Sequence, residues 1–390
     1  MQLMNSFLTE KENEELISRR RDFHAHPELA YRENRTSTIA ARHLQECGYE
    51  TKTGVAQTGV VGLLRAGSGK TLMLRADMDC LPVTEENAVP YSSQNQGFMH
   101  ACGHDGHTAV LMTVAKKLME EKQKLKGNVK IIFQPAEEGG NGAEKMVQEG
   151  VLQNPHVDAA FGLHVWTSLP VGKIALNRGA LLAGVHGFEV QVVGKGGHGA
   201  APHQTIDPIV TAAQMITALQ TVVSRNVDPL ATAVVTVGSI QGGTAFNVIP
   251  DRVKFSGTVR YFDPTLGEQM PKWIERIISG ISEASGARYE LKYEKMTPPT
   301  INDPRMAEFI HDVAADIIGA HNIVMDAQTM GGEDMSFFLN EVPGCFFFVG
   351  GRNDAKNLNH PHHSPRFDFD EACLEIGAEI LCRATQKFLS

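Results

Sequence analysis

Five short segments of the chain bring together histidine, cysteine and carboxylate side chains, the residue types that bind transition metals. Each segment lies at or just after the end of a predicted strand. Because sites in open parallel sheets assemble at the carboxyl ends of the strands, we expect the five segments to meet at one edge of a sheet. They are RADMD (75–79), HACGHDGH (100–107), QPAEE (134–138), GLH (162–164) and HPHHS (360–364).

Cys102 and His104 are separated by one residue, so in a turn both side chains could reach one ion. A thiolate and an imidazole suit zinc or another borderline transition metal. Glycine at positions 103 and 106 permits the tight backbone that such a loop needs. Taken alone, the pair is explained equally well by a buried cysteine beside a histidine at a helix start.

Glu137 and Glu138 are adjacent carboxylates that follow an apolar strand and Pro135. They cannot both be buried without an ion or a proton to compensate them. One of them could bind a metal while the other acts as a general base toward water. An isolated Glu-Glu pair is more often a solvated loop, and a lone histidine such as His164 is more often a core residue. The coincidence of five such segments at one edge favours a metal centre.

The glycine-rich segments do not match nucleotide-binding motifs. GSGKT (67–71) resembles a phosphate-binding loop, but the upstream position that requires glycine is Leu64, and the segment leads into a strand. We expect it to form a hairpin turn. GKGGHG (194–199) lacks the dinucleotide-binding spacing. The chain has no G-x-S-x-G and no H-E-x-x-H pattern, so serine-hydrolase and zincin chemistry have no support.

Length and composition indicate a folded protein with room for two domains. The chain has 390 residues, of which 42% are hydrophobic and 21% are charged. The net charge is −9, and the one basic cluster, residues 19–21, is expected on the polar face of the first helix, so no nucleic-acid partner is expected. No apolar run approaches ~18 residues, so no membrane partner is expected either.

The cysteines and the N-terminal segment bear on the cellular compartment. The first fifteen residues, MQLMNSFLTEKENEE, are acidic and lack a positive region followed by an apolar stretch, so a secretory signal is not expected. The six cysteines are widely spaced, and none forms a C-x-x-C pair. We therefore expect reduced thiols and a cytoplasmic location.

The elements that must position these residues alternate between helices and strands in the first half. A Thr9-x-x-Glu12 capping box opens a helix that runs to about residue 21. Continuous apolar strands between helices predict an α/β fold with a mostly parallel sheet and helices on both faces. The remaining expected helices are 33–47 and 107–125, and the expected strands are 59–64, 71–74, 129–133 and 159–163.

From about residue 181 the pattern changes to alternating strands with two long helices, which is typical of an inserted α+β, ferredoxin-like domain. After Pro298-Pro299 the first pattern returns, with an apolar strand at 345–349 and a final helix from 370. The sequence therefore predicts a split catalytic domain, 1–180 and 297–390, with an inserted lid or dimerisation domain, 181–296. The inserted helices are expected at 206–225 and 266–285, and the strands at 186–193, 231–240, 251–262 and 289–293.

In combination, the motifs resemble those of the dinuclear-metal amidohydrolases of the aminoacylase and carboxypeptidase-G superfamily. The chain looks most like the branch of hippurate hydrolases, N-acyl-amino-acid amidohydrolases and plant auxin-conjugate hydrolases. The resemblance covers nearly the whole chain. Its segments are HAHPEL (24–29), RADMDCLP (75–82), HACGHDGH, QPAEEGG (134–140), GLHVW (162–166), GKGGHGAAPH (194–203), FNVIPD (246–251), MGGEDMSFF (330–338) and HHSPRFDFDE (362–371).

The resemblance implies two divalent metal ions per chain, zinc or manganese, with cobalt and nickel also possible. Cys102 would bridge the two ions, and each ion would have two further ligands. Glu137 would be the general base. Asp79 and Asp105 would orient the ligand histidines. The further ligands implied are Glu138 and His363 for one ion, and His104 and His164 for the other.

The resemblance also nominates residues of the inserted domain. His198 would donate to the oxyanion once that domain closes, and in several relatives it acts across a dimer; Asn247 and Arg260 would bind the substrate carboxylate or carbonyl. A homodimer or homotetramer is therefore expected. The implied reaction is hydrolysis of the amide bond of an N-acyl-L-amino acid. The alternatives are a dipeptidase or small-peptide carboxypeptidase on the same scaffold and, more distantly, a catalytically silent ligand-binding protein.

Overall fold

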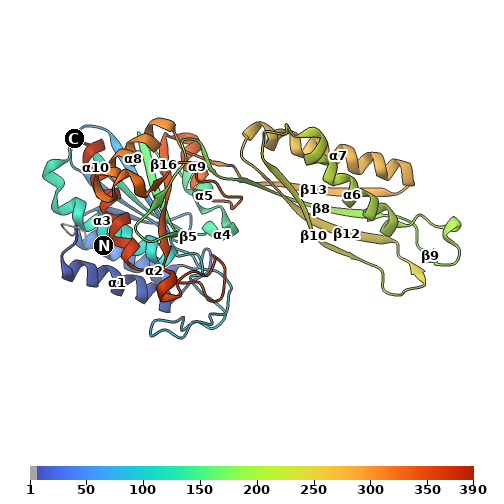
Figure 1. The fold of residues 1–390 in the computed structure, drawn as a ribbon, viewed down its shortest axis with the longest axis horizontal. Coiled ribbons are helices and arrows are strands. Elements are labelled where there is room, and N and C mark those ends of the chain that lie inside the picture. Colours follow the sequence, from blue (N-terminus) through green and yellow to red (C-terminus); the bar gives the residue numbers. More distant parts are fainter. Residues whose placement is uncertain (1–6) are drawn as a thin grey trace. The chain divides into compact units, whose positions relative to one another are not determined.

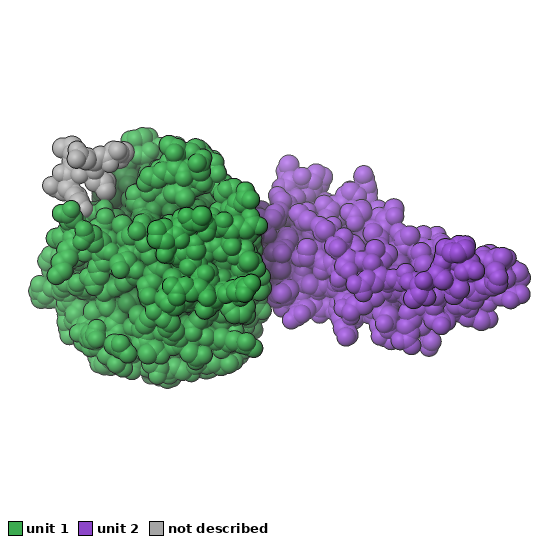
Figure 2. Space-filling view, turned by 90° about the horizontal axis from the view of Figure 1, so that it is seen from below, with its two compact units in different colours: residues 1–181, 301–328, 334–390 green, residues 182–300, 329–333 purple. Residues whose placement is uncertain are grey.

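The structure, a computed structural model, describes residues 7–390. Residues 1–6, which open the segment expected not to be a secretory signal, lie outside the described residues. The chain divides into two compact units, which Figure 2 shows in green and purple. The first contains Met1–Leu181, Ile301–Gln328 and Asp334–Ser390, and the second contains Leu182–Thr300 and Thr329–Glu333.

This division begins the second unit within one residue of the predicted boundary, and it differs from the prediction more clearly in two other places. The second unit continues to Thr300, and it also takes in the short segment 329–333. The main-chain N–H of Ala183 donates hydrogen bonds to the carbonyls of Thr329 and Gly331 at 3.2 and 3.0 Å, which holds this segment on the second unit. Pairing between residues so far apart in the chain leaves no local signal in the sequence.

The main sheet of the first unit has the strand order β1-β2-β4-β3-β5-β16-β6-β15. Its centre, β4-β3-β5-β16, is parallel, and the pairs β1-β2, β2-β4 and β16-β6 are antiparallel. The predicted α/β class is confirmed. The strands are β1 (Glu50–Val55), β2 (Gly59–Arg65), β3 (Thr71–Asp77), β4 (Asn128–Gln134), β5 (Ala159–Pro170), β6 (Ile174–Ala175), β15 (Ile323–Val324) and β16 (Gly344–Arg352).

Helices pack against this sheet (Figure 1). The hydroxyl of Thr9 accepts from the N–H of Glu12, and the Glu12 carboxylate accepts from the N–H of Thr9, so the predicted capping box opens α1. Leu72 and Leu74 of β3 join the main hydrophobic core with α3 and α10. The helices are α1 (Glu10–Ala25), α2 (Asn34–Glu46), α3 (His104–Glu120), α4 (Glu137–Gly140), α5 (Gly142–Gln148), α8 (Pro304–Ile318), α9 (Met335–Glu341) and α10 (Ala372–Phe388), with short 3₁₀ turns at Lys122–Lys124, Ala320–Asn322 and Asp354–Lys356.

Two local predictions for this unit are wrong. The segment 67–71 does not form a β-hairpin, because β4 lies between β2 and β3 in the sheet. Glycine is needed at position 67 because the chain passes close to another backbone segment there. A Cβ at Gly67 would lie 2.1 Å from the carbonyl oxygen of Lys126. Arg20 does not belong to a polar face of α1, because its side chain is fully buried between Asp105 and Asp368, at 2.8 and 2.7 Å.

The second unit has the βαββαβ order of a ferredoxin-like domain, as predicted. Its antiparallel sheet has the order β10-β12-β8-β13, and α6 and α7 lie along one face of it (Figure 1). Phe188, Val190 and Phe255 fill the core under these helices. The elements are β8 (Gly184–Val193), β9 (Gly197–His198), α6 (Pro208–Asn226), β10 (Ala233–Gly242), β11 (Val248–Ile249), β12 (Arg252–Tyr261), α7 (Pro264–Ser285) and β13 (Arg288–Thr297), with a 3₁₀ turn at Pro202–Gln204; β7 (Ala180–Leu182) and β14 (Thr300–Ile301) carry the chain across the unit boundary.

No helix among residues 7–390 is long and apolar enough to cross a membrane. All six cysteines of the sequence lie within this range, and each of them is free. The main site of interest lies in the first unit.

Candidate metal centre

Cys102 and His104 flank the turn that begins α3. The segment HACGHDGH therefore opens a helix after the irregular stretch 78–103, and does not directly follow a strand. Gly103 stands at the N-cap with φ +92°, a left-handed conformation that favours glycine. His104 is completely buried and Cys102 is half-buried. The thiol of Cys102 and a ring nitrogen of His104 lie within 4.8 Å of each other.

His164 lies inside β5 and not at the end of a strand, because β5 continues in parallel pairing with β16 beyond it. Its Nδ1 donates to the carbonyl of Val165 at 2.7 Å. Its Nε2 lies 3.4 Å from Sγ of Cys102. Burial holds the pKa of His164 well below its usual value, so the ring is neutral and Nε2 carries a lone pair.

Glu137 and Glu138 form α4, a short distorted turn that follows Ala136. Ala136 has φ +55° and ψ +47°, which is left-handed and unusual for a residue other than glycine. The carboxylate of Asp79 accepts from the N–H of Glu137 at 3.0 Å and from the N–H of Glu138 at 2.9 Å. Nδ1 of His104 donates a hydrogen bond to the main-chain carbonyl of Asp79 at 2.8 Å. The same nitrogen lies 3.4 Å from Oδ1 of the Asp79 side chain. Asp79 therefore positions both glutamates as well as a histidine.

His363 approaches from the loop after β16. It has φ +65°, and its N–H donates to the carbonyl of Ala101 at 2.8 Å. Its Nε2 lies 3.4 Å from Oε1 of Glu138, and the carboxylate of Glu138 raises the pKa of His363. His362 points elsewhere, since its Nε2 donates to the carbonyl of Val165 at 2.9 Å. Of the two adjacent histidines, His363 is therefore the one whose ring lies beside Glu138.

The predicted ligands converge in two sets that share one sulfur. Within each set, the ligand atoms all lie within 4.8 Å of one another. A third set places Glu137 beside His104 and Glu138. The structure thus brings together residues from segments far apart in the chain, and their role as ligands stays a prediction. The two sets are Cys102, His104 and His164, and Cys102, Glu138 and His363.

Two buried atoms of this cluster are suited to receive a cation. Among residues 7–390, Nε2 of His104 makes no hydrogen bond, and the contact of Oε1 of Glu138 with Nε2 of His363, at 3.4 Å, is too poorly aligned to count as one. Because Nδ1 of His104 is engaged by Asp79, the unpaired Nε2 is the atom left for a ligand bond. Buried polar atoms without partners are costly, and a cation offsets the cost at both atoms. A mixed sulfur, nitrogen and oxygen donor set fits divalent ions such as zinc.

The local charges also favour a cation. Burial opposes charge on His104, but the carboxylates of Asp77 and Asp79 raise its pKa to about 10. Oδ2 of Asp77 lies 3.9 Å from Nε2 of His104, and Oε2 of Glu137 lies 4.0 Å from the same atom. The field around Nε2 therefore stabilises positive charge, which a divalent ion would supply.

His107 positions the strand that carries His164, a role that sequence reasoning missed. Its Nδ1 donates to Oδ1 of Asp77 at 2.6 Å, and its Nε2 accepts from the N–H of Val165 at 2.9 Å. Arg75 fixes Asp77 from the other side, with Nη1 donating to Oδ2 at 2.7 Å. His107 follows His104 by three residues on α3, and this helical spacing is a signal that could have identified it.

Arg75 extends the network to two further residues without a predicted role. Its Nε donates to Oε1 of Gln134 at 2.7 Å, and its Nη2 donates to Oδ1 of Asp334 at 2.9 Å. Nε2 of Gln134 also donates to Asp334, at 2.7 Å. All three side chains are buried. They tie β3 and the end of β4 to Asp334, the residue before α9.

Asp105 differs from its predicted role. Its Oδ2 accepts from Nε of Arg20 and from Nδ1 of His24, both at 2.8 Å, and neither residue is a predicted ligand. Asp105 therefore anchors the start of α3 to α1. Burial opposes ionisation, but Arg20 and His24 together hold the pKa of Asp105 well below its usual value.

Two of the three predicted residues of the second unit lie side by side. His198 pairs with Val248, and the N–H of Gly199 donates to the carbonyl of Asn247 at 2.9 Å. Arg260 lies far from them within this unit, because it pairs with Val185 at the start of β8, and the turn to His198 leaves the other end of β8. Arg260 is partly buried and donates to Thr258 and Met330, both uncharged partners.

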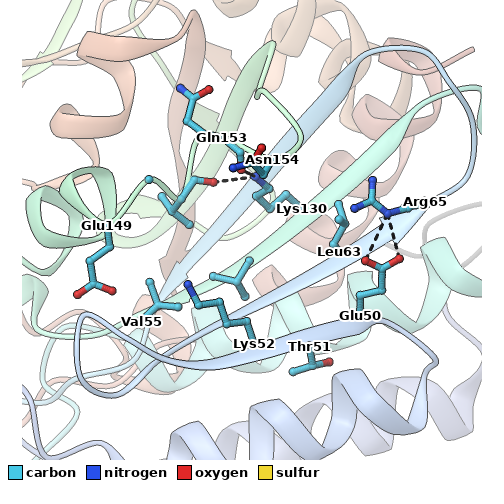
Figure 3. A pocket seen from close by; sticks show the side chains of 13 residues that line it. Glu50, Thr51, Lys52, Val55, Leu63, Arg65, Lys130, Glu149, Gln153 and Asn154 are labelled. Carbon is cyan, nitrogen blue, oxygen red and sulfur yellow. Dashed lines mark hydrogen bonds and ion pairs between the residues drawn. The ribbon is translucent and has the colours of Figure 1, made fainter.

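A separate cavity of about 350 Å³ lies over β1, β2 and β4 and is also lined by residues 149–151, 153 and 154 (Figure 3). Nζ of Lys130 ends beside it and donates to the carbonyls of Val151, Gln153 and Pro155 at 2.7, 2.9 and 3.0 Å. Each proton of the ammonium group therefore has a protein partner. Among the described residues that line the cavity there is no predicted site residue, so we assign the chemistry to the cluster around Cys102.

Comparisons with a family model and with known proteins point to one family of hydrolases. The family model of peptidase family M20/M25/M40 matches residues 73–387. IAA-amino acid hydrolase ILR1-like 4 of Arabidopsis thaliana is 42% identical over 378 residues, which cover 96% of this chain and 86% of that protein. N-acetyl-L-cysteine deacetylase of Bacillus subtilis is 39% identical over 376 residues, which cover 96% of this chain and 88% of that protein.

A solved structure extends the similarity to three dimensions. The YXEP protein of Bacillus subtilis, a dinuclear metal binding peptidase from the M20 family, superposes with a TM-score of 0.83 at 34% identity. The alignment covers 98% of this chain and 99% of that one.

Proposed function

Because the chain belongs to peptidase family M20/M25/M40 and is a metallo-amidohydrolase of that family, we propose that it hydrolyses the amide bond of N-acyl-L-amino acids. The products are a carboxylic acid and an amino acid. The observation that carries the proposal is the pair of ligand sets sharing Cys102, with Glu137 beside them. Relatives that are named for IAA-amino acids and for N-acetyl-L-cysteine support this substrate class.

We propose that two divalent ions, zinc or manganese, are held by the five converging residues. When bound there, such ions supply Lewis acidity toward a carbonyl oxygen and toward water. The similar dinuclear metal binding peptidase supports this assignment. The five ligands are Cys102, His104, Glu138, His164 and His363.

Glu137 is proposed as the general base. Its carboxylate is only partly buried and lies 4.0 Å from Nε2 of His104, so it borders the ligand cluster while solvent still reaches it. It accepts a proton from the attacking water as the C–O bond forms, and it returns that proton to the leaving nitrogen as the C–N bond breaks. The proton count is then balanced over the cycle.

His198, Asn247 and Arg260 are proposed to act on the substrate. Nδ1 of His198 accepts from the N–H of Ala200 at 3.0 Å, which leaves its Nε2–H available to donate to a developing oxyanion. Arg260 has uncharged partners only in the described structure, so its guanidinium is suited to receive the substrate carboxylate.

We propose a homodimer, which the placement of these residues supports. Arg260 lies near the C-terminal end of β12, and Asn247 lies just before its N-terminal end. Arg260 and Asn247 are therefore separated by most of a ten-residue strand, about 25–30 Å. One small substrate cannot touch both within one unit. We therefore propose that His198 and Asn247 act on a substrate held by a second copy. Exposed Ile240 and Phe246 on this unit support such an interface.

A reducing, cytoplasmic location is proposed on the cysteines alone. All six are free in the described structure, and Cys102 needs to remain a thiolate to hold metal.

The test of the proposed function is a substrate panel measured on metal-loaded protein. Acetyl-, benzoyl- and indoleacetyl-amino acids are compared with dipeptides that have a free amino group. We expect higher kcat/KM on the acylated substrates. Faster turnover of dipeptides would favour a dipeptidase, and turnover of neither class, with metal bound, would favour a silent binding protein.

A further inference from the structure

A buried carboxylate outside the metal centre binds the backbone from which the proposed general base extends. Glu33 is 0% exposed. Its Oε1 accepts from the N–H of Ala136 at 2.8 Å and from the N–H of Tyr31 at 3.0 Å. Its Oε2 accepts from the hydroxyl of Thr58 at 2.6 Å. Ala136 is the residue immediately before Glu137.

The two residues whose amides bind Glu33 both have a positive φ angle, which residues with a Cβ rarely adopt. Tyr31 has φ +60° and Ala136 has φ +55°. Left-handed geometry is costly for residues with a Cβ and persists only where the surroundings hold it. One carboxylate thus stabilises two unfavourable backbone turns at once.

The next two amides are held in the same way by a second buried carboxylate. Oδ1 and Oδ2 of Asp79 accept from the N–H groups of Glu137 and Glu138 at 3.0 and 2.9 Å. The far end of the turn is fixed as well, since the hydroxyl of Tyr31 donates to the carbonyl of Gly140 at 2.5 Å. Three consecutive amides, 136–138, are therefore bound to carboxylates.

A role for Glu33 in capping its own helix does not explain this geometry. Glu33 occupies the N-cap of α2, but its side chain makes no capping bond. The first-turn amides of Arg35 and Thr36 are instead accepted by Glu28, at 2.9 and 2.8 Å. The carboxylate of Glu33 is thus turned away from α2 and toward Ala136.

We propose that Glu33 is a positioning residue that sets the direction of Glu137 by holding Ala136 in its left-handed turn. The inference rests on the proposed function, because it assumes that Glu137 is the base. When Glu33 is removed, Asp79 still holds the amides of Glu137 and Glu138. Glu137 directly follows Ala136 and takes up any change of its backbone angles, whereas Glu138 is one residue further away, so the effect is expected on turnover and not on metal binding. A displacement of a catalytic group by about 1 Å can cost 100-fold in rate.

The test compares Glu33→Ala with two conservative changes. In Glu33→Ala we expect kcat to fall about 100-fold, with KM within about twofold and metal content equal to the wild type. Glu33→Gln should keep most activity, because its amide oxygen can accept both backbone bonds and its amide nitrogen can donate to Thr58. Thr58→Val is the matched control, which removes one bond to Glu33 and leaves Ala136 held.

A rescue experiment separates positioning from general destabilisation. Glycine adopts a positive φ at little cost, so Ala136→Gly in the Glu33→Ala background should recover about tenfold in kcat, the equivalent of the left-handed penalty. Hydrogen exchange of the segment 135–141, which does not require activity, should be faster in Glu33→Ala and normal in Glu33→Gln.

The outcomes distinguish the two proposals. An unchanged kcat in Glu33→Ala, or a loss of metal in step with the loss of activity, would overturn the positioning role. A wild type that cleaves no amide would remove the proposed function, and the exchange measurement would still show whether Glu33 holds the turn.

Discussion

Sγ of Cys102 lies 3.4 Å from Nε2 of His164, although 62 residues separate them in the chain. Cys102 comes from the turn before α3 and His164 from the middle of β5. From the sequence alone, Cys102 and His164 could each be either a metal ligand or an ordinary buried residue. A soft thiolate beside a neutral imidazole is a suitable pair for a borderline divalent ion.

Replacing the shared thiol should abolish metal binding. Cys102 belongs to both ligand sets, so Cys102→Ala removes one ligand from each. We expect less than about a tenth of the wild-type metal content after dialysis, since structural loss of a ligand weakens binding steeply. Cys102→Asp should retain part of the metal, because a carboxylate can also bridge two cations. Elemental analysis checks both, and full metal content in Cys102→Ala would contradict the bridging role.

Replacing the proposed base should spare the metal. Glu137→Gln keeps the size of the side chain but removes its ability to take a proton. We expect kcat to fall by about 10²–10⁴ with metal content unchanged. Glu144→Gln, in the following helix and outside the ligand sets, is the control and should be near normal. Near-normal turnover in Glu137→Gln would show that another group accepts the proton.

Replacing His107 should weaken metal binding, although His107 is not one of the proposed ligands. His107 links Asp77 to the N–H of Val165, next to His164. In His107→Gln we expect metal affinity to fall about 10–100-fold, measured by competition with a chelator. Asp77→Asn should have a similar effect, because its partner loses a charged acceptor. Unchanged affinity in both variants would mean that the network only packs the core.

His24 should make stability depend on pH. Burial lowers its pKa, but the carboxylate of Asp105 and the hydrogen bond that the ring donates to Glu85 outweigh this and raise the pKa to about 9. The pKa in the folded state is thus above the unfolded value of about 6.5. The stabilisation is complete below pH 6.5 and is lost as pH rises toward 9, up to about 3 kcal/mol. The groups around the ring are Asp105, Glu85, Arg20, His100 and Tyr91.

The check is the free energy of unfolding of metal-loaded protein between pH 6 and 9.5, for the wild type and for His24→Gln. The wild type should lose stability across this window more steeply than the variant. Parallel curves for the two proteins would assign the pH dependence to other groups.

The dimer proposal predicts complementation between inactive variants. His198→Ala and Arg260→Ala should each lose most activity. If each site combines Arg260 of one copy with His198 of the other, mixing the two variants creates one intact site in each heterodimer. Activity should return to about a quarter of the wild type after random exchange of subunits. No recovery, with exchange demonstrated by a tagged copy, would contradict the shared site.

The fold class and the segments of the site could be predicted because their signals are local. Apolar runs and caps placed most strands and helices, and motif segments such as HACGHDGH contain the residue types that meet in the cluster around Cys102. β5 was expected to end before His164, yet it continues to Pro170 because it pairs with β16, a strand nearly two hundred residues later. Pairing of this kind leaves no trace in a short window of sequence.

The supporting residues could not be predicted, because their partners are distant. Arg20 looked like part of a basic surface and is buried with Asp105 and Asp368. Glu33 looked like the start of a helix and binds an amide 103 positions away. A buried charge is recognised only when its partner is known, and one sequence does not contain that information.

The most direct test of the account is the anomalous-difference map of crystals grown with the loaded metal. The account predicts two peaks per chain, one on each side of Sγ of Cys102 and about 2.3 Å from it if the metal is zinc. One peak should lie beside His104 and His164, and the other beside Glu138 and His363. A single peak, or peaks away from Cys102, would contradict the shared dinuclear centre.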